Sequence, residues 1–365
     1  MGNLSIARYR GSIYIRQGYK YFRYPHHNIH AIIQMTTVKD VARKAQVSIG
    51  TVSKVLSKDP TVKTALRDRV MGAVEQLGYR PNLAARALRT NKLNIIGLVV
   101  PDISNPFFAQ LAKDVEAEAA KHEHMVMLAN SDDDPIVENR QIESLLAQLP
   151  RGLIIVGSVD LSIVPIKTDI PIISVDRRYA DYKLITANHE SGSALVAKHL
   201  FDLGHRRIAY ISGPQSTEVG RLRKKGFYEL LQCTALDSEA LDLQCVEGNF
   251  DYSSGEKITR KLLQVDPLKR PTAIAAASDQ QAIGALRVAR DLGINVPSEL
   301  SIAGFDDIGL AELVVPRLTS VAQRTHKMAQ LAVQQLLPGQ SMITEDKLVE
   351  TVLKFRDSTA IANSD

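Results

Sequence analysis

From about Asn94 onward, short apolar runs alternate with amphipathic stretches. The runs NIIGLVV, MVMLA, LIIV and PIISV are rich in β-branched residues, and stretches such as FFAQLAKDVEAEAAKH separate them. A second series begins near His189, with RIAYIS, TAIAAA and LSIAGF as its apolar runs. Repeated βα units predict parallel sheets flanked by helices. Two such series predict an α/β body made of two Rossmann-like subdomains.

Residues 35–80 show a different pattern, typical of a small all-α module. Apolar residues within 38–45 recur at i, i+3, i+4 and i+7, which predicts a helix that Thr36 or Thr37 can cap. A two-residue turn follows, and Ser48 can cap a second helix. A third amphipathic helix comes next. Two short helices joined by a tight turn and braced by a third form the helix-turn-helix pattern.

The second helix of such a pattern fits the major groove of DNA and offers its outer face to the base edges. Here that face holds Ile49, Gly50, Ser53 and Lys54. A lysine donates to guanine and an isoleucine contacts a thymine methyl, while Ser53 and Thr51 can hold phosphate. The alternative is a small helical bundle that does not bind DNA.

The charge distribution bears on this choice. Residues 1–34 contain five Lys or Arg and no acid, and residues 35–94 contain 12 Lys or Arg against four acids. The remainder carries 28 basic against 36 acidic residues, so a basic N-terminal block precedes an acidic body. This arrangement suits a module that binds a polyanion, although a solvated basic surface accounts for the charge equally well.

The segments TTVKDVARKAQVSIGTVSKVL and VMGAVEQLGYRPNLAARALRT resemble the DNA-binding head of the lac repressor/galactose repressor family. The resemblance implies that the recognition helix starts at Ser48 and that Ile49, Gly50 and Lys54 read bases. Arginine or histidine is commoner than lysine at position 54, and Gly50 has no side chain, so the outer bases of the operator are not predictable. The residues expected to contact DNA are Thr37, Ser48, Ile49, Gly50, Thr51, Ser53, Lys54, Asn82, Arg86 and Leu88.

Residues 81–94 form the expected hinge between head and body. Pro81 suits a first helical turn, but the segment is too short to be a stable helix alone. The family's hinge helix orders on DNA, pairs with its twin in a dimer and inserts a leucine into the minor groove; Leu88 matches that leucine. Such a wedge is cheapest at a pyrimidine–purine step, so we expect a palindromic operator with a central CG step. The alternative is an ordinary linker with Leu88 packed on the body.

Polar side chains follow many of the apolar runs of the body. Ligands of such folds bind beyond the carboxyl ends of the strands. Carboxylates, an amide and arginines between aromatic rings suit a polyhydroxylated ring. For any single Asp, capping of the next helix is the competing interpretation.

The resemblance extends over nearly all of residues 35–357. IGLVVPDISNPFF, LFDLGHRRIAYISGP, ASDQQAIGALR and SIAGFDDI look like the family's effector domain, which is similar to periplasmic sugar-binding proteins. Ser278 departs from a frequent asparagine, and Arg151 replaces a frequent aspartate. The residues that the resemblance implies as effector ligands are Asn105, Phe107, Asp176, Arg177, Arg223, Phe250, Ser278, Asp279 and Asp306.

We therefore expect an effector-binding domain over 95–357. Its N-subdomain is predicted at about 95–187 and 319–347, and its C-subdomain at about 188–318 and 348–357, with a tail at 358–365. Residues 1–34 match nothing in the family and are predicted to be a disordered extension, or not translated, with Met35 as the natural start. A DNA- or membrane-touching arm is the alternative.

These observations predict a cytoplasmic, nucleoid-associated regulator that represses carbohydrate-use genes as a homodimer. A sugar or sugar phosphate is the expected effector, and we expect it to act as an inducer. The two cysteines, Cys233 and Cys245, fit a reducing compartment, and no membrane span, metal or cofactor is expected. The alternative is a sugar-binding protein or sugar-processing enzyme without a regulatory role, but no export signal or catalytic motif supports it.

Overall fold

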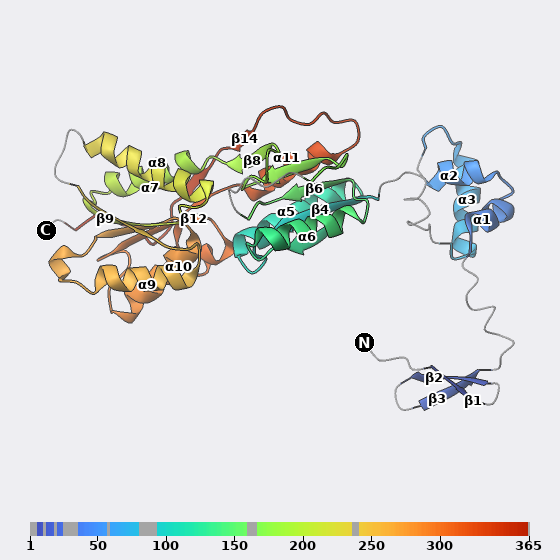
Figure 1. Cartoon of the computed structure of the whole chain (residues 1–365), viewed down its shortest axis with the longest axis horizontal. Helices are drawn as coiled ribbons and strands as arrows, with labels where there is room; N and C mark the ends of the chain where they lie inside the picture. Colours follow the sequence, from blue (N-terminus) through green and yellow to red (C-terminus); the bar gives the residue numbers. More distant parts are fainter. Residues whose placement is uncertain are drawn as a thin grey trace. The chain divides into compact units, whose positions relative to one another are not determined.

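The computed structural model describes residues 36–56, 59–79, 93–158, 166–235 and 241–363, together with the backbone of three strands nearer the N-terminus. Contacts divide the chain into two compact units, Met1–Arg89 and Thr90–Asp365 (Figure 1).

The head in the first unit has the three predicted helices, α1 (Val38–Ala45), α2 (Ile49–Leu56) and α3 (Thr64–Gln76). Thr37 caps α1 in a capping box with Asp40, which satisfies two backbone donors at once. Gln46 adopts a left-handed conformation and lets the chain turn into α2. The apolar stripes meet in one core, which contains Val41, Ala45, Val52, Val55, Val70 and Ala73.

Three antiparallel strands precede the head: β1 (Ile6–Tyr9), β2 (Ser12–Gln17) and β3 (Lys20–Tyr24). This differs from the predicted disordered extension. The strands are rich in Ile, Tyr and Phe, which favour β-structure, and a glycine falls in each two-residue connection, as is typical of hairpins. Met35 as the natural start stays a prediction.

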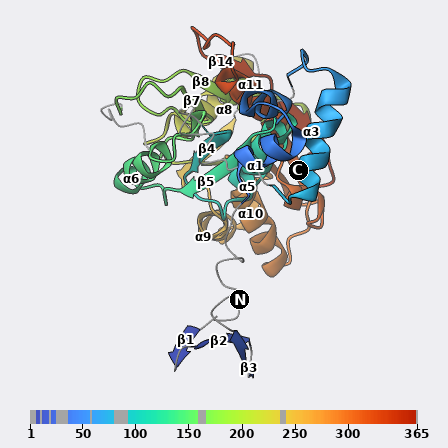
Figure 2. The ribbon, with the colours of Figure 1, turned by 90° about the vertical axis from the view of Figure 1, so that its right-hand side faces the viewer.

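The first lobe of the body is built on a parallel sheet of order β14-β8-β7-β6-β4-β5. Helices α5 (Pro106–Lys121) and α11 (Thr325–Leu336) cover one face, and α6 (Pro135–Leu146) covers the other, as Figure 2 shows for α5 and α6. The strands are β4 (Ile95–Val100), β5 (Met125–Asn130), β6 (Gly152–Ile155), β7 (Ile172–Val175), β8 (Leu184–Ala187) and β14 (Lys347–Val349).

The second lobe repeats the design with a sheet of order β10-β9-β11-β12-β13-β15, in which only the β13–β15 pair is antiparallel. Helices α7 (His189–Asp202) and α8 (Glu218–Ala235) lie on one face, and α9 (Tyr252–Leu263) and α10 (Asp279–Asp291) on the other (Figure 1). The strands are β9 (Arg207–Ser212), β10 (Asp242–Glu247), β11 (Ala273–Ala276), β12 (Ser301–Asp306), β13 (Thr319–Ala322) and β15 (Val352–Lys354). Short 3-10 helices are η2 (Pro267–Lys269) and η3 (Gly309–Glu312).

The structure corrects the predicted subdomain boundaries. The segment 319–322 was expected in the first lobe, but it is β13 and pairs with β12 of the second lobe. The segment 347–349 is β14 of the first lobe, and the expected tail packs on the second lobe, where Ile302 N donates to Ser358 O. Pairing with neighbouring strands decides to which lobe each of these segments belongs. The hydrophobic periodicity of the adjacent helices carries no information about that pairing. The chain therefore crosses between lobes near Asn188, near Gln323 and between β14 and β15.

Candidate DNA-binding and effector sites

The head places the predicted base-reading face in solvent. On α2, Ile49, Gly50 and Lys54 are exposed and Ser53 is partly exposed, while Val52 and Val55 are buried. Ser48 accepts a hydrogen bond from Thr51 N at 3.1 Å and so begins the helix, as predicted. The orientation of α2 thus leaves its polar face open to a partner.

The hinge residues expected to contact DNA, namely Asn82, Arg86 and Leu88, lie outside the described residues. Their role stays a prediction.

Arg223, on α8, is the centre of a buried polar cluster at the carboxyl ends of the strands of the second lobe. Its Nη1 donates to Asp306 Oδ1 at 3.0 Å and to Ala277 O, which follows β11. The guanidinium lies 3.9 Å from the ring centre of Phe305 and 5.4 Å from that of Phe250. Charge pairing and two aromatic faces fix one orientation of the side chain.

Asp306 ends β12 in a strained conformation. Its φ of 118° is one that non-glycine residues rarely adopt, and such strain concentrates at functional sites. Burial raises the pKa of its carboxyl to about 6, although Arg223 opposes that shift. Gln323, at the second crossover, donates from Nε2 to Asp306 Oδ1 at 2.6 Å.

Asp176 and His189 extend the cluster into the first lobe. Asp176 follows β7 and also has a positive φ of 61°. Its Oδ1 lies 3.5 Å from His189 Nε2, too far for a well-formed hydrogen bond. Burial raises the pKa of Asp176, but His189, Arg177 and Arg223 outweigh this effect and leave it below the usual value. Burial lowers the pKa of His189, so the ring is neutral at pH 7.

Phe250 reaches the same cluster from the loop after β10. A Cβ built on Gly213, just after β9, would lie 2.2 Å from the Phe250 ring, so only glycine admits the ring there. The structure thus brings together Asp176, Arg223, Phe250 and Asp306 of the nine predicted effector residues. Their ligand contacts stay a prediction.

Two other predicted effector residues of the second lobe have their polar atoms engaged within the protein. Ser278 caps α10 by accepting from Gln281 N. The Asp279 carboxylate accepts from Ser320 Oγ and from Ile308 N, and burial raises its pKa well above the usual value. In this structure, Ser278 caps a helix and Asp279 holds the loop after β12, as the alternative to ligand binding predicts.

In the first lobe, Asn105 caps α5 by accepting from Phe107 N at 3.0 Å. Phe107 packs in the core with its ring edge-on to Phe108. Arg177 donates to Asp133 Oδ1 at 2.9 Å, and its guanidinium lies 5.4 Å from the Phe108 ring centre.

Sequence reasoning missed His189 and Gln323 as members of the cluster. Sequence reasoning also did not single out Glu138 on α6, a buried carboxylate that accepts a hydrogen bond from Ser158 N. Burial raises the pKa of Glu138. His189 opens the second βα series, but nothing local in its sequence shows that it faces Asp176 and Arg223. Gln323 follows a strand that had been assigned to the other lobe.

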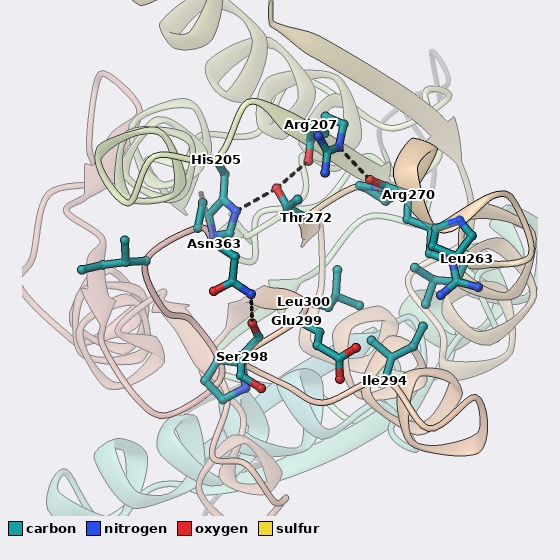
Figure 3. A pocket seen from close by; sticks show the side chains of 15 residues that line it. His205, Arg207, Leu263, Arg270, Thr272, Ile294, Ser298, Glu299, Leu300 and Asn363 are labelled. Atoms are coloured by element: carbon teal, nitrogen blue, oxygen red, sulfur yellow. Dashed lines mark hydrogen bonds between the residues drawn. The ribbon is translucent and has the colours of Figure 1, made fainter. Parts of the chain in front are cut away.

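A cavity of about 280 Å³ lies at the opposite, amino-terminal end of the second sheet (Figure 3). Polar groups of its lining are hydrogen-bonded within the protein: His205 contacts Thr272, and Asn363 donates to Ser298 O. None of the described residues that line this cavity has a buried polar side-chain atom without a hydrogen-bond partner, whereas Asp176 and Gln323 of the Arg223 cluster do.

Comparisons with known proteins match both units. Residues 37–82 match the model of bacterial regulatory proteins of the lacI family, and residues 197–359 match a periplasmic binding protein-like domain. Catabolite control protein A of Priestia megaterium is 34% identical over 88% of this chain and 99% of that protein. The chain belongs to the lacI family of bacterial regulatory proteins. The regulator GalS of Salmonella typhimurium is 35% identical over 84% of this chain and 90% of its own length.

Solved structures confirm the predicted fold of this lacI-family protein. A lac repressor dimer bound to operator and an anti-inducer matches with a TM-score of 0.75 and 27% identity, over 90% of this chain and all of that one. A LacI family regulator from Enterococcus faecium with bound ribose matches with a TM-score of 0.63 and 26% identity, over 74% of this chain and all of that one.

Within the described residues, no helix is long and apolar enough to span a membrane, and no group of His, Cys, Asp and Glu could hold a metal ion.

Proposed function

We propose that this lacI-family regulator binds a palindromic DNA operator as a homodimer, represses carbohydrate-use genes and is released by an uncharged sugar held at the Arg223 cluster. The observation that carries the proposal is that Arg223, Asp306, Phe250 and Asp176 converge from both lobes at the carboxyl ends of their strands. Ligands of open α/β sheets bind at this edge. The protein would act in the cytoplasm, at the nucleoid.

The head supports binding to DNA. Its α2 exposes Ile49 and Lys54, and residues 35–94 carry eight more positive than negative charges. Phosphate neutralisation by such a surface makes affinity fall steeply with salt. Lys54 and Ile49 would supply the base contacts, while Thr37, Ser48, Thr51 and Ser53 would hold phosphates.

Exposed apolar side chains on the body support the homodimer. The edge strand β5 exposes 68% of Met125, 37% of Met127 and 43% of Leu128. In the second lobe, Leu313 and Val315 near η3 are 74% and 93% exposed. Clusters of this kind mark protein–protein contacts, and a symmetric dimer matches the symmetry of a palindrome.

Two buried acceptor atoms of the cluster point to the chemistry of the effector. Asp176 Oδ1 and Gln323 Oε1 have no hydrogen-bond partner among the described residues. An unpaired buried acceptor destabilises the protein, so a ligand that donates hydrogen bonds to both atoms is favoured here. The hydroxyl groups of a sugar are such donors. Arg223 already pairs with Asp306, and Arg177 with Asp133, so a carboxylate beside each guanidinium disfavours a phosphate dianion there. These contacts favour a neutral polyol over a sugar phosphate.

The test is a thermal-shift screen of neutral sugars and their phosphates, followed by gel shifts on the upstream DNA of the gene. A neutral sugar should raise the melting temperature by several degrees at saturation and should weaken the DNA complex. An Arg223→Ala variant should still bind DNA but should ignore that sugar. A response only to sugar phosphates, or none to any sugar, would refute the ligand assignment.

The gel shift tests operator binding independently of the sugar screen. Absence of a salt-sensitive, sequence-specific shift at any sugar concentration would refute the operator assignment. Turnover of the sugar by the purified protein would instead favour an enzyme, an activity that none of the named relatives suggests.

A further inference from the structure

We propose that His189 and Gln323 are positioning residues, which hold the Arg223–Asp306 pair and tie its geometry to two of the three crossovers between the lobes. The inference rests on the proposed function for its use, because the pair it positions is the proposed effector site. Both residues lie at the points where the chain passes from one lobe to the other.

The hydrogen bonds fix the role of His189. Arg223 Nε can only donate, so His189 Nδ1, 3.2 Å away, must accept. The ring proton therefore sits on Nε2, which faces Thr186 Oγ1 at 3.0 Å. Thr186 belongs to β8 of the first lobe, and its own hydroxyl donates to Asp176 O. His189 thus connects the first lobe to the guanidinium of the second.

Gln323 contacts the Asp306 side of the Arg223–Asp306 pair. Its Nε2 donates to Asp306 Oδ1, the same oxygen that accepts from Arg223. The next residue, Arg324, has a positive φ of 55° and directly precedes α11 of the first lobe. Gln323 is 1% exposed and His189 is 2% exposed, so neither bond competes with bulk water.

A continuous polar chain therefore runs from Thr186 through His189, Arg223 and Asp306 to Gln323. A ligand that displaces the Arg223–Asp306 pair from these bonds would alter contacts at two crossovers at once. These bonds supply a direct physical connection between a ligand at the cluster and the relative orientation of the lobes. Asp176 and Arg177 are the other charged groups facing the His189 ring.

The test is hydrogen–deuterium exchange of the full-length protein without any sugar, read on peptides covering 186–192 and 320–326. His189→Leu removes both ring contacts, and we expect exchange about tenfold faster in both peptides, which is the effect of losing a hydrogen bond to a charged group. His189→Gln can accept from Arg223 and donate to Thr186, so it should restore slow exchange. Thr186→Val keeps the ring and should give an intermediate effect.

His205→Leu is the matched control, because His205 is also a buried, hydrogen-bonded histidine of the second lobe. It should accelerate exchange near 297–301 and 358–362 while the two crossover peptides keep their wild-type rates. If His189→Leu is misfolded, Thr186→Val and Gln323→Leu carry the test.

A second measurement follows the Arg223 Nε proton by NMR. It should exchange slowly in the wild type and in His189→Gln, and fast in His189→Leu. Acceleration confined to 186–192, or equal rates in His189→Leu and His189→Gln, would overturn the inference. Because no sugar is used, a failed sugar screen leaves this test intact, and the outcomes of the two remain separate.

Discussion

Arg223 and Asp306 form an ion pair of 3.0 Å in which only 4% and 8% of the two side chains are exposed. A buried pair gains little over an apolar replacement, but loss of one partner leaves an uncompensated charge. The same pair that is proposed to read the effector is therefore also a point on which the stability of the second lobe depends.

Arg223→Ala should lower the free energy of unfolding by about 3–5 kcal/mol, because it strands the Asp306 carboxylate. The double variant with Asp306→Asn should recover part of that loss, since it removes the stranded charge. Urea unfolding of the single and double variants measures the coupling. Strictly additive losses would show that the pair does not interact in solution.

The raised pKa of Asp306 predicts a pH dependence. The folded protein holds a proton on this carboxyl up to about pH 6, whereas the unfolded chain loses it near pH 4, so the contribution to stability is present at low pH and is lost as pH rises through about 6. Asp306→Asn removes this contribution. The stability of the wild type relative to Asp306→Asn should therefore decrease between pH 4.5 and pH 7.

Asp357 provides the control for this titration. It is an exposed carboxylate paired with Arg317, and that hydrogen bond lowers its pKa. The curve for Asp357→Asn should run parallel to the wild type between pH 4.5 and pH 7. Parallel curves for Asp306→Asn as well would contradict the assignment of the titration to Asp306.

Lys54→Ala should reduce discrimination between operator and scrambled DNA, because it removes the proposed guanine contact. A good base contact contributes about 1–3 kcal/mol of discrimination. Lys44→Ala, an exposed lysine on α1, should weaken binding to both DNAs equally. Fluorescence anisotropy on the two DNAs at several salt concentrations separates the effects. Equal discrimination by the two variants would exclude Lys54 as a base reader.

Met125→Asp on the edge strand β5 should weaken the homodimer at least about tenfold, because it places a charge in a desolvated contact. The measurement is sedimentation velocity over a range of concentrations. Leu268→Asp, at an 80% exposed position on η2, should leave the dimer unchanged. A Met125→Asp protein that sediments as the wild type would move the interface away from β5.

The helices of the head were predictable because their signals are local. Thr37 and Ser48 cap their helices, and the spacing of Val41, Ala45, Val52 and Val55 defines one apolar face per helix. Arg223, Asp306 and Phe250 were predictable from motifs, and the structure brings them together. Ser278 and Asp279 show the limit of that reasoning, because a polar residue after a strand has the same local sequence whether it caps a helix or binds a ligand.

The helix-turn-helix head, the two series of βα units and the motif residues at the strand ends were thus predictable from local patterns. The place of β13 in the second lobe, and the addition of His189 and Gln323 to the cluster around Arg223, became visible with the packed structure. This difference follows from the range of the interactions. Periodicity and capping act within a few residues, whereas strand pairing and the bond from His189 to Arg223, 34 residues away, depend on where the chain crosses between lobes.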